Sequence, residues 1–161
     1  MNYTEKTNAM RILERAGILY EVRAYAYDED DLSAEKAADA LGMPRERVFK
    51  TLALRGERRG VLLALVPAGT DIDLKKLAKA SGDKRVELVP LREVRKLTGY
   101  ERGAVTPLAL PKRYPVVIDE TVELWPSVGI SAGVRGVEIV LSPGDLLQVT
   151  YAETADIARS S

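Results

Sequence analysis

The amino-acid sequence predicts a single mixed α+β domain that spans residues 1–161. Apolar runs with a period of two alternate with short segments whose apolar residues recur at helical spacing, which is typical of α+β folds. Two of the strand-like runs, Arg47–Leu54 and Val61–Val66, are joined by a short polar stretch with two glycines, which predicts a hairpin. Internal repeats, low-complexity segments and linkers are absent from the sequence, which favours one domain.

The first part of the chain predicts two helices and a strand. Its expected elements, in order, are a helix over Asn8–Gly17, a strand over Ile18–Tyr25, a loop at Asp28–Asp31 and a helix that starts after Ser33 and ends at Gly42. Thr7 or Asn8 is the expected N-cap of the first helix and Ser33 that of the second, because short polar side chains satisfy the free N–H groups of a first turn.

The middle of the chain predicts a hairpin, two helices and a long loop. After the hairpin, the expected elements are a helix from Asp71 or Asp73 to Ala80 that Gly82 closes, a strand over Arg85–Val89, a helix over Leu91–Leu97 and a loop over Tyr100–Arg113. The first of these helices is expected to turn Leu74, Leu77 and Ala78 towards the core. Long loops inside compact domains often carry function.

The last part of the chain predicts two strands and two helices. Its expected elements are a strand over Pro115–Asp119, an apolar segment at Val122–Trp125, a glycine-rich strand-turn element at Ser127–Gly136, a strand over Val137–Leu141, a helix that begins at Ser142–Pro143 and a final helix over Tyr151–Ala158. Serine followed by proline is a typical helix start, because proline fits the first helical position.

One lysine stands among the apolar residues of the first hairpin strand. Lys50 shares its parity with Val48 and Leu54, so a strand points its ammonium to the same face as aliphatic side chains. Burying an unpaired ammonium is costly, so the residue needs either water, a partner or a role. One interpretation is that Lys50 reaches along the apolar surface to water, and the other is that it lies in a site that uses its charge.

The charges are balanced overall but unevenly distributed. The chain has 24 Lys and Arg and 24 Asp and Glu, so net charge alone predicts no polyanionic partner. Eleven basic and only four acidic residues, however, lie within Leu74–Arg113. Such a stretch suits a phosphate backbone, and the alternative interpretation is a solvated helix surface with ion pairs.

The chain contains no cysteine and no histidine. This excludes disulfides, Ser-His-Asp triads, Cys-His pairs and the usual zinc sites. The acidic run Asp28–Asp31 lacks the pattern of a calcium loop, so neither a metal nor a cofactor is expected. No apolar run suits a signal peptide or a membrane span, so we expect a cytoplasmic protein without a membrane partner.

The chemical groups that remain are few. They are carboxylates, backbone N–H groups in the glycine-rich loops, Lys50, and the hydroxyls of Tyr25, Thr51, Thr106 and Ser131. Such groups can polarise a carbonyl and hold an oxyanion, but they offer no strong general base. A hydrolytic reaction therefore needs an assisted water or a substrate that brings its own nucleophile. The alternative interpretation of the glycine loops is tight turning alone.

A set of fragments in fixed order resembles one known family. The fragments are Val48–Leu52, Asp73–Ala80, Thr98–Gly103, Thr106–Leu108, Ser131–Gly136, Glu138–Ile139 and Gly144–Leu146. Together they resemble the YbaK family of free-standing aminoacyl-tRNA deacylases, which are related to the editing domain of bacterial prolyl-tRNA synthetases. The resemblance implies an α+β fold around a mostly antiparallel, barrel-like sheet with short flanking helices. It also implies a pocket for the aminoacylated 3′ end of tRNA.

The resemblance implies an activity and the residues that carry it. Members of the family hydrolyse mischarged tRNA, so the implied function is trans-editing of Cys-tRNA(Pro), with Ala-tRNA(Pro) as the alternative substrate and prolyl-tRNA synthetase as a potential partner. The implied residues are Lys50, Gly103 and Ser131 for catalysis, Tyr25, Leu32, Thr51, Thr106, Pro107, Gly133 and Glu138 for substrate binding, and Lys75, Lys76, Lys112, Arg113 and Arg135 for tRNA binding.

In this interpretation Lys50 holds the terminal phosphate or ribose, and N–H groups near Gly103 and Gly133 stabilise the oxyanion. The thiol of the substrate attacks its own ester in the cysteine-specific branch of the family. Leu32 and Glu138 depart from the family pattern close to the pocket, which affects substrate choice more than activity. A hypothesis of another class is a non-catalytic tRNA-binding or synthetase-associated module. The deacylase hypothesis requires Lys50 to face a cavity that it shares with Gly103 and Ser131.

Overall fold

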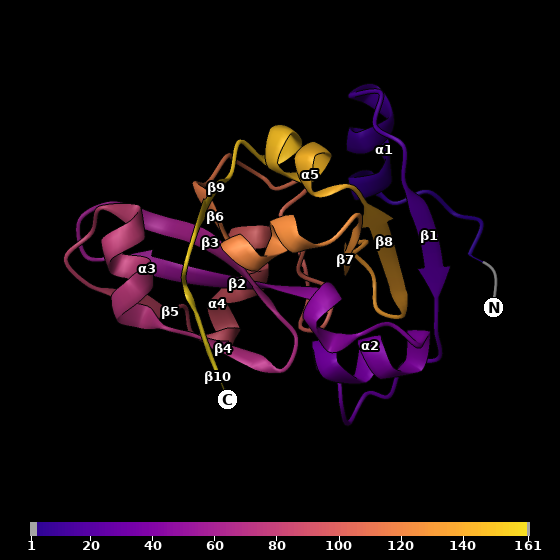
Figure 1. Ribbon diagram of the computed structural model, residues 1–161, viewed down its shortest axis with the longest axis horizontal. Helices are drawn as coiled ribbons and strands as arrows, with labels where there is room; N and C mark the ends of the chain where they lie inside the picture. Colours follow the sequence, from indigo (N-terminus) through magenta and orange to yellow (C-terminus); the bar gives the residue numbers. More distant parts are fainter. Residues whose placement is uncertain (1–2, 161) are drawn as a thin grey trace.

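The computed structural model describes residues 3–160, in which short helices and strands alternate along the chain (Figure 1). The helices are α1 (Asn8–Arg15), α2 (Ala34–Leu41), α3 (Leu74–Ser81), α4 (Leu91–Thr98) and α5 (Pro143–Thr150). The strands are β1 (Glu21–Ala24), β2 (Phe49–Gly56), β3 (Gly60–Pro67), β4 (Thr70–Ile72), β5 (Val86–Leu88), β6 (Val116–Asp119), β7 (Val128–Ser131), β8 (Val137–Leu141), β9 (Glu153–Ala155) and β10 (Ala158–Ser160). None of the helices within these residues has the length and apolarity that crossing a membrane requires.

Polar side chains fix where four of the helices begin. Each capping oxygen accepts a hydrogen bond from the backbone N–H three residues further on, at 3.0–3.3 Å. The capping residues are Thr7, Ser33, Asp73 and Ser142. These caps confirm the predicted helix starts, and they decide between the two alternatives for α3 in favour of Asp73.

The strands form three sheets and no closed barrel within residues 3–160. The largest sheet has the order β5-β2-β3-β6-β9, and the three-stranded sheet has the order β1-β8-β7. The last pair joins β10 to β4. Most pairs are antiparallel, as predicted, but β6 pairs in parallel with both β3 and β9. A β-bridge between Val48 and Gly129 and the packing of β2 against β7 join the two larger sheets without closing a barrel among the described residues.

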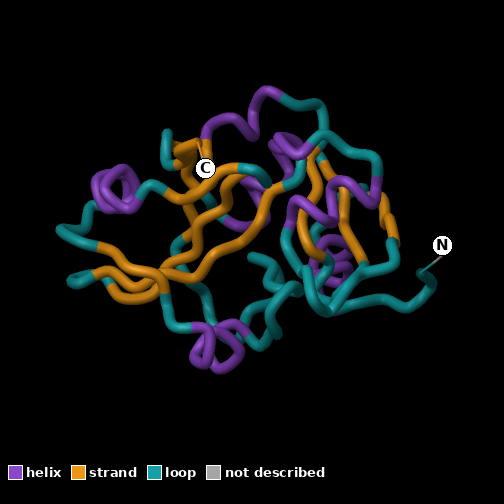
Figure 2. Tube along the Cα trace, turned by 90° about the horizontal axis from the view of Figure 1, so that it is seen from below, coloured by secondary structure: helices purple, strands orange, loops and turns teal. Residues whose placement is uncertain are grey.

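The predicted hairpin positions Lys50 at one end of the largest sheet. Strands β2 and β3 pair along their whole length, and Lys50 lies opposite Val66. The two larger sheets form separate groups of strands along the molecule, with helices on their outer sides (Figure 2). The end of β2 that carries Lys50 points towards β7, so this lysine lies where the two sheets meet (Figure 1).

Alternate residues of β2 enter different hydrophobic clusters. Phe49 and Ala53 belong to the larger cluster, which also includes residues of α1 and of the three-stranded sheet. Leu54 belongs to a second cluster with residues of β3 and α3, and Leu52 packs against it. The parity predicted for β2 is confirmed, so Lys50 lies on the strand face that packs against α3.

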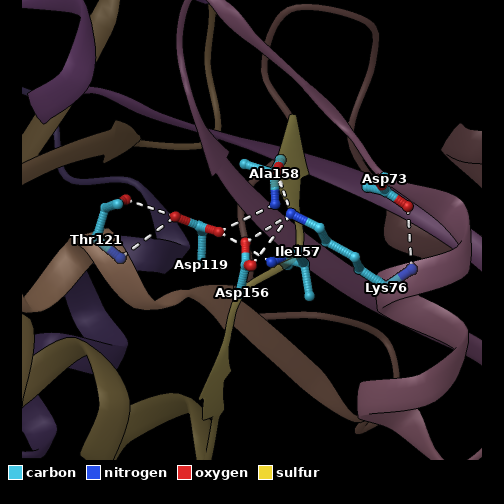
Figure 3. Close-up of polar contacts among 7 residues, drawn as sticks. All are labelled: Asp73, Lys76, Asp119, Thr121, Asp156, Ile157 and Ala158. Carbon is cyan, nitrogen blue, oxygen red and sulfur yellow. Dashed lines mark hydrogen bonds and ion pairs between the residues drawn. The ribbon is translucent and has the colours of Figure 1, made fainter. Parts of the chain in front are cut away.

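The chain after α5 differs from the prediction. The expected final helix over Tyr151–Ala158 is wrong, because this segment forms β9 and β10. Tyr151 adopts a left-handed φ of 55° and ends α5. The buried carboxylate of Asp119 then accepts the N–H groups of Ile157 and Ala158, each at 3.0 Å (Figure 3). These contacts hold the segment as strands along β6 and β4.

One residue of α3 also differs from its predicted place. Leu77 and Ala78 are buried against the sheet as expected, but Leu74 remains 39% exposed. It occupies the first position of the helix, directly after the Asp73 cap, at the edge of the packed face.

Candidate active site

A cavity of about 190 Å³ lies among α2, the start of β2 and the loops around Gly103 and Ser131. Its lining residues come from segments far apart in the sequence: Tyr25, Leu32, Ser33, Ala34, Ala37, Phe49, Lys50, Thr51, Gly103, Val105, Ser131 and Glu138. The structure thus brings Lys50, Gly103 and Ser131 into one cavity, together with four of the seven residues predicted to bind substrate.

Lys50 is held in the cavity by a carboxylate. Its Nζ lies 3.5 Å from Oε1 of Glu35 in the first turn of α2, and the two side chains are 24% and 26% exposed. The same oxygen accepts the Gly69 N–H at 2.7 Å. Burial raises the pKa of the Glu35 carboxyl group, but the bond from Gly69 and the charge of Lys50 outweigh it and hold this pKa below its ordinary value. The Lys50 ammonium is therefore partnered and mostly buried, which disagrees with a side chain that simply reaches into water.

Gly103 packs against Leu32 at a position that only glycine fits. Its φ is +83°, and a Cβ there would lie 2.9 Å from the Cβ of Leu32. A larger residue would be strained in this left-handed conformation and would also collide with Leu32. Within residues 3–160, no acceptor is bonded to the Gly103 N–H. This backbone group can therefore donate to a ligand.

The hydroxyl of Ser131 ties the two glycine loops together. It donates to the Ala104 carbonyl at 3.0 Å and accepts the Gly133 N–H at 3.1 Å. Both interactions hold the Gly103 loop against the end of β7, so the geometry suits a positioning residue rather than a nucleophile. Gly133 itself does not line the cavity, and its N–H is already bonded, so it does not offer the oxyanion donor that the sequence predicted.

Glu138 places a carboxyl group in the cavity wall with only 5% of the residue exposed. Burial raises its pKa from the ordinary 4.5 to about 8, because water no longer stabilises the charged form. The nearby phenol of Tyr25 is affected in the same direction: burial first, and then the charge of Glu138, raise its pKa to about 12. At neutral pH the wall therefore presents two protonated groups that can donate or accept hydrogen bonds.

The two predicted threonines lie in different surroundings. Thr51 lines the cavity, and its buried Oγ1 has no hydrogen-bond partner among the described residues. Thr106 is fully buried with an equally unpartnered Oγ1, but it does not line the cavity. Pro107 lines a separate hollow beside Lys112. Thr106 and Pro107 therefore do not line the cavity as the sequence predicted, because the loop turns inwards after Val105 and buries both residues.

The cations predicted to bind tRNA belong to three separate segments of the chain. Lys75 and Lys76 lie on α3, where Lys76 is paired with Asp156 at 3.1 Å. Lys112 and Arg113 lie over the rings of Tyr114 and Tyr151, at 5.6 and 4.3 Å from the ring centres. Arg135 lies nearest to the cavity loops, since its Nε donates to the Arg102 carbonyl at 2.9 Å.

Sequence reasoning missed Glu35. The residue follows the Ser33 cap, where an acidic side chain is expected in any helix because it interacts favourably with the N-terminal end of the helix dipole. No local pattern indicates that it reaches Lys50 in β2. The proximity of Glu35 to Lys50 becomes visible only in the three-dimensional structure.

The fold and the cavity define an α+β protein with a small pocket around a lysine, a glycine loop and a buried carboxyl group. A sequence model of the aminoacyl-tRNA editing domain matches residues 28–149, which include every cavity residue except Tyr25. The chain therefore belongs to the aminoacyl-tRNA editing domain family.

Individual relatives agree with this family. The chain is 40% identical over 153 residues to a protein of Enterococcus faecalis named as a candidate Cys-tRNA(Pro)/Cys-tRNA(Cys) deacylase, EbsC, with 95% of this chain and 93% of that protein covered. It is 38% identical over 78 residues to a Proline--tRNA ligase of Pelotomaculum thermopropionicum, with 48% of this chain and 14% of the ligase covered. The fold resembles the crystal structure of a candidate trans-editing enzyme for prolyl-tRNA synthetase with a TM-score of 0.83 and 28% identity, and 98% of this chain and 100% of that chain are covered.

Proposed function

We propose that this protein is a trans-editing deacylase, which hydrolyses the ester between a misplaced amino acid and its tRNA. The proposal rests on the cavity of about 190 Å³ in which Lys50, the Gly103 loop and Glu138 meet. Pockets for drug-sized ligands measure roughly 300–1,000 Å³. The smaller cavity suits an amino acid but not the nucleotide that carries it.

We propose Cys-tRNA(Pro) as the substrate, because the chain has neither histidine nor cysteine to form a nucleophile-base pair. The thiolate of the cysteinyl group attacks its own ester carbonyl and forms a tetrahedral oxyanion. When this collapses, the bond to the ribose oxygen breaks, that oxygen takes up a proton, and a four-membered thiolactone forms. Water then opens the thiolactone to give free cysteine. The name of the E. faecalis relative supports the same substrate.

Each group of the cavity has a distinct part in this reaction. The Lys50 ammonium binds the ribose or the terminal phosphate, and Glu35 keeps it in place. The free N–H of Gly103 donates to the developing oxyanion. Glu138 and Thr51 bind the polar atoms of the amino acid, and Tyr25 and Leu32 limit the space beside them. Ser131 positions the Gly103 loop through its bonds to Ala104 and Gly133.

The similarity to a Proline--tRNA ligase supports prolyl-tRNA synthetase as the partner that produces the substrate. We place the reaction in the cytoplasm, where bacterial synthetases charge tRNA. Lys75, Lys112 and Arg113 are the proposed contacts to the tRNA phosphates, which makes binding strongly dependent on salt.

A panel of charged tRNAs tests the proposal. The protein should release the amino acid from Cys-tRNA(Pro), whereas Ala-tRNA(Pro) and Ser-tRNA(Pro) should resist because neither carries a thiol. Cleavage of the cysteinyl and alanyl esters at similar rates would instead indicate attack by water and the Ala-tRNA(Pro) alternative. Binding of tRNA without release of any amino acid would contradict the proposal and favour a non-catalytic module.

A further inference from the structure

A second and larger cavity, of about 530 Å³, shares Lys50 with the first. Its other walls come from β2, β4, β5, the start of α3 and β10, and they include Leu52, Leu74, Lys75, Leu88 and Arg159. Its volume lies within the range of roughly 300–1,000 Å³ that is typical of small-molecule sites. Lys50 lines both cavities, so its ammonium borders each of them.

Three leucines give the larger cavity an apolar wall that remains open to solvent. Leu74 is 39% and Leu88 is 52% exposed, although large aliphatic side chains are usually buried. Leu52, on β2, is partly buried beside them. Such a surface suits the flat face of an aromatic ring, which needs apolar contact on its faces and polar contact at its edge.

Two cations beside this wall have no partner within residues 3–160. Neither Lys75 nor Arg159 forms an ion pair or a hydrogen bond through its side chain, whereas the adjacent Lys76 is bound to Asp156 at 3.1 Å (Figure 3). The unpartnered charges line the cavity, and the paired one does not. The larger cavity therefore combines an apolar wall with two cations that are available to an anion and with the carboxylates of Asp71 and Asp73.

The segments that carry these cations are fixed before any ligand binds. Asp119 holds the start of β10 through the N–H groups of Ile157 and Ala158 (Figure 3). Arg159 is the next residue of this strand. Asp73 caps α3 through the Lys76 N–H at 3.0 Å and so orients the turn that carries Lys75. A preformed site avoids part of the entropic cost of binding.

We propose that the larger cavity binds the terminal adenosine nucleotide of the tRNA acceptor end, which deepens the proposed function and rests on it. The adenine lies against Leu52, Leu74 and Leu88, and the 5′ phosphate is bound by Lys75 and Arg159. The ribose then lies at Lys50, with its ester directed into the smaller cavity. The two cavities thus divide the substrate between nucleotide and amino acid.

Asp71 gives this site a preference for adenine. Its carboxylate lines the cavity opposite Arg159 in the β4–β10 pair, and it has no hydrogen-bond partner among the residues that the structure describes. A carboxylate accepts hydrogen bonds and repels phosphate, so it suits the exocyclic amino group of adenine. Hypoxanthine has a carbonyl in that place and offers no such donor.

Binding of AMP and IMP to the full chain tests the inference without any catalytic step. AMP should shift the methyl NMR signals of Leu52, Leu74 and Leu88, and Arg159→Ala should weaken its binding about tenfold through loss of a charge-assisted hydrogen bond. Lys79→Ala is the matched control, because this exposed lysine lies on the same helix α3 but does not line the cavity, and it should leave AMP affinity unchanged. Asp71→Asn should reduce the preference for AMP over IMP.

Deacylation assays separate this inference from the proposed function. Arg159→Ala should raise the KM for Cys-tRNA(Pro) with little change in kcat, because the nucleotide contact is equal in the ground state and the transition state. Absence of leucine methyl shifts, or equal effects of Arg159→Ala and Lys79→Ala on AMP affinity, would overturn the nucleotide site. If AMP binds as expected but wild-type protein deacylates no tRNA, the nucleotide site stands and the proposed function fails.

Discussion

The two cavities that meet at Lys50 differ in size and in the groups that line them. The smaller one is bordered by a glycine loop and has a buried carboxyl group with a raised pKa in its wall. The larger one is bordered by exposed leucines and by cations that stand free of ion pairs within residues 3–160. Buried polar groups such as Glu138 can take part in catalysis, because their interactions are strong in a low dielectric. Exposed apolar and charged surfaces are better suited to binding part of a ligand. Lys50 lies at the boundary between the two.

Gly103→Ala should produce the largest difference between the cavities. A Cβ within 2.9 Å of Leu32, at a φ of +83°, displaces the loop that bears the oxyanion donor. Deacylation of Cys-tRNA(Pro) should fall about 100-fold or more, as for loss of other oxyanion donors, while AMP affinity at the larger cavity stays unchanged.

Gly17→Ala is the matched control for this change. Gly17 has a similar φ of +71°, but no atom lies within 4 Å of an added Cβ. The control should lose some stability and keep its activity. Equal activity losses in the two variants would show that backbone strain alone, rather than the shape of the cavity, explains the effect.

Glu35→Gln tests whether the carboxylate positions Lys50 for the smaller cavity. The amide keeps an acceptor for the Gly69 N–H but loses the charge that faces Lys50 at 3.5 Å. We expect kcat for Cys-tRNA(Pro) to fall about tenfold, because the contribution of a partly buried charged hydrogen bond is of that order. Asp39 lies on the same helix α2 as Glu35, and Asp39→Asn, which removes its exposed pair with Arg45, should have no effect on kcat. A kcat for Glu35→Gln equal to that of Asp39→Asn would contradict the positioning role.

Glu138→Gln tests the buried character of the smaller cavity through stability. The pKa of the Glu138 carboxyl group is higher in the folded protein than in the unfolded chain, so ionising this group costs more free energy in the folded state. Wild-type stability should therefore be lost as pH rises from about 4.5 to about 8. Relative to wild type, Glu138→Gln should be similar at pH 5 and more stable at pH 9 by about 4 kcal/mol.

Thermal unfolding at the two pH values measures this difference. Glu123→Gln, at an exposed position, is the control and should follow the wild type at both. A Glu138→Gln variant whose advantage over wild type is the same at pH 5 and pH 9 would show that Glu138 is ionised without penalty in the folded protein.

The sequence carried the local features of the site but not its long-range contacts. Parity within β2 placed Lys50 on an inward face, and the short polar residues Thr7 and Ser33 marked helix starts, because each feature depends on neighbours along the chain. The bond between Glu35 and Lys50 depends on the packing of α2 against β2, which no local pattern encodes. Gly133 was misplaced for a different reason, because a local hydrogen bond to the Ser131 hydroxyl of its own loop already occupies its N–H.

The end of the chain shows the same limit. Its apolar residues suited a helix, but Asp119 in β6 binds the backbone of Ile157 and Ala158 and imposes an extended conformation. This strand carries Arg159 to the larger cavity, so the nucleotide site was invisible from the sequence. Tertiary hydrogen bonds to the backbone can override local helix propensity.

Single-turnover release of cysteine from Cys-tRNA(Pro) by wild type and Lys50→Ala tests the role of the boundary lysine most directly. The variant should be slower by about 100-fold or more, because it loses the cation that binds the substrate where the cavities meet. Lys6→Ala, which removes an exposed lysine paired with Glu14, should react at the wild-type rate. A Lys50→Ala rate within about twofold of wild type would contradict the assignment of this cavity as the site of deacylation.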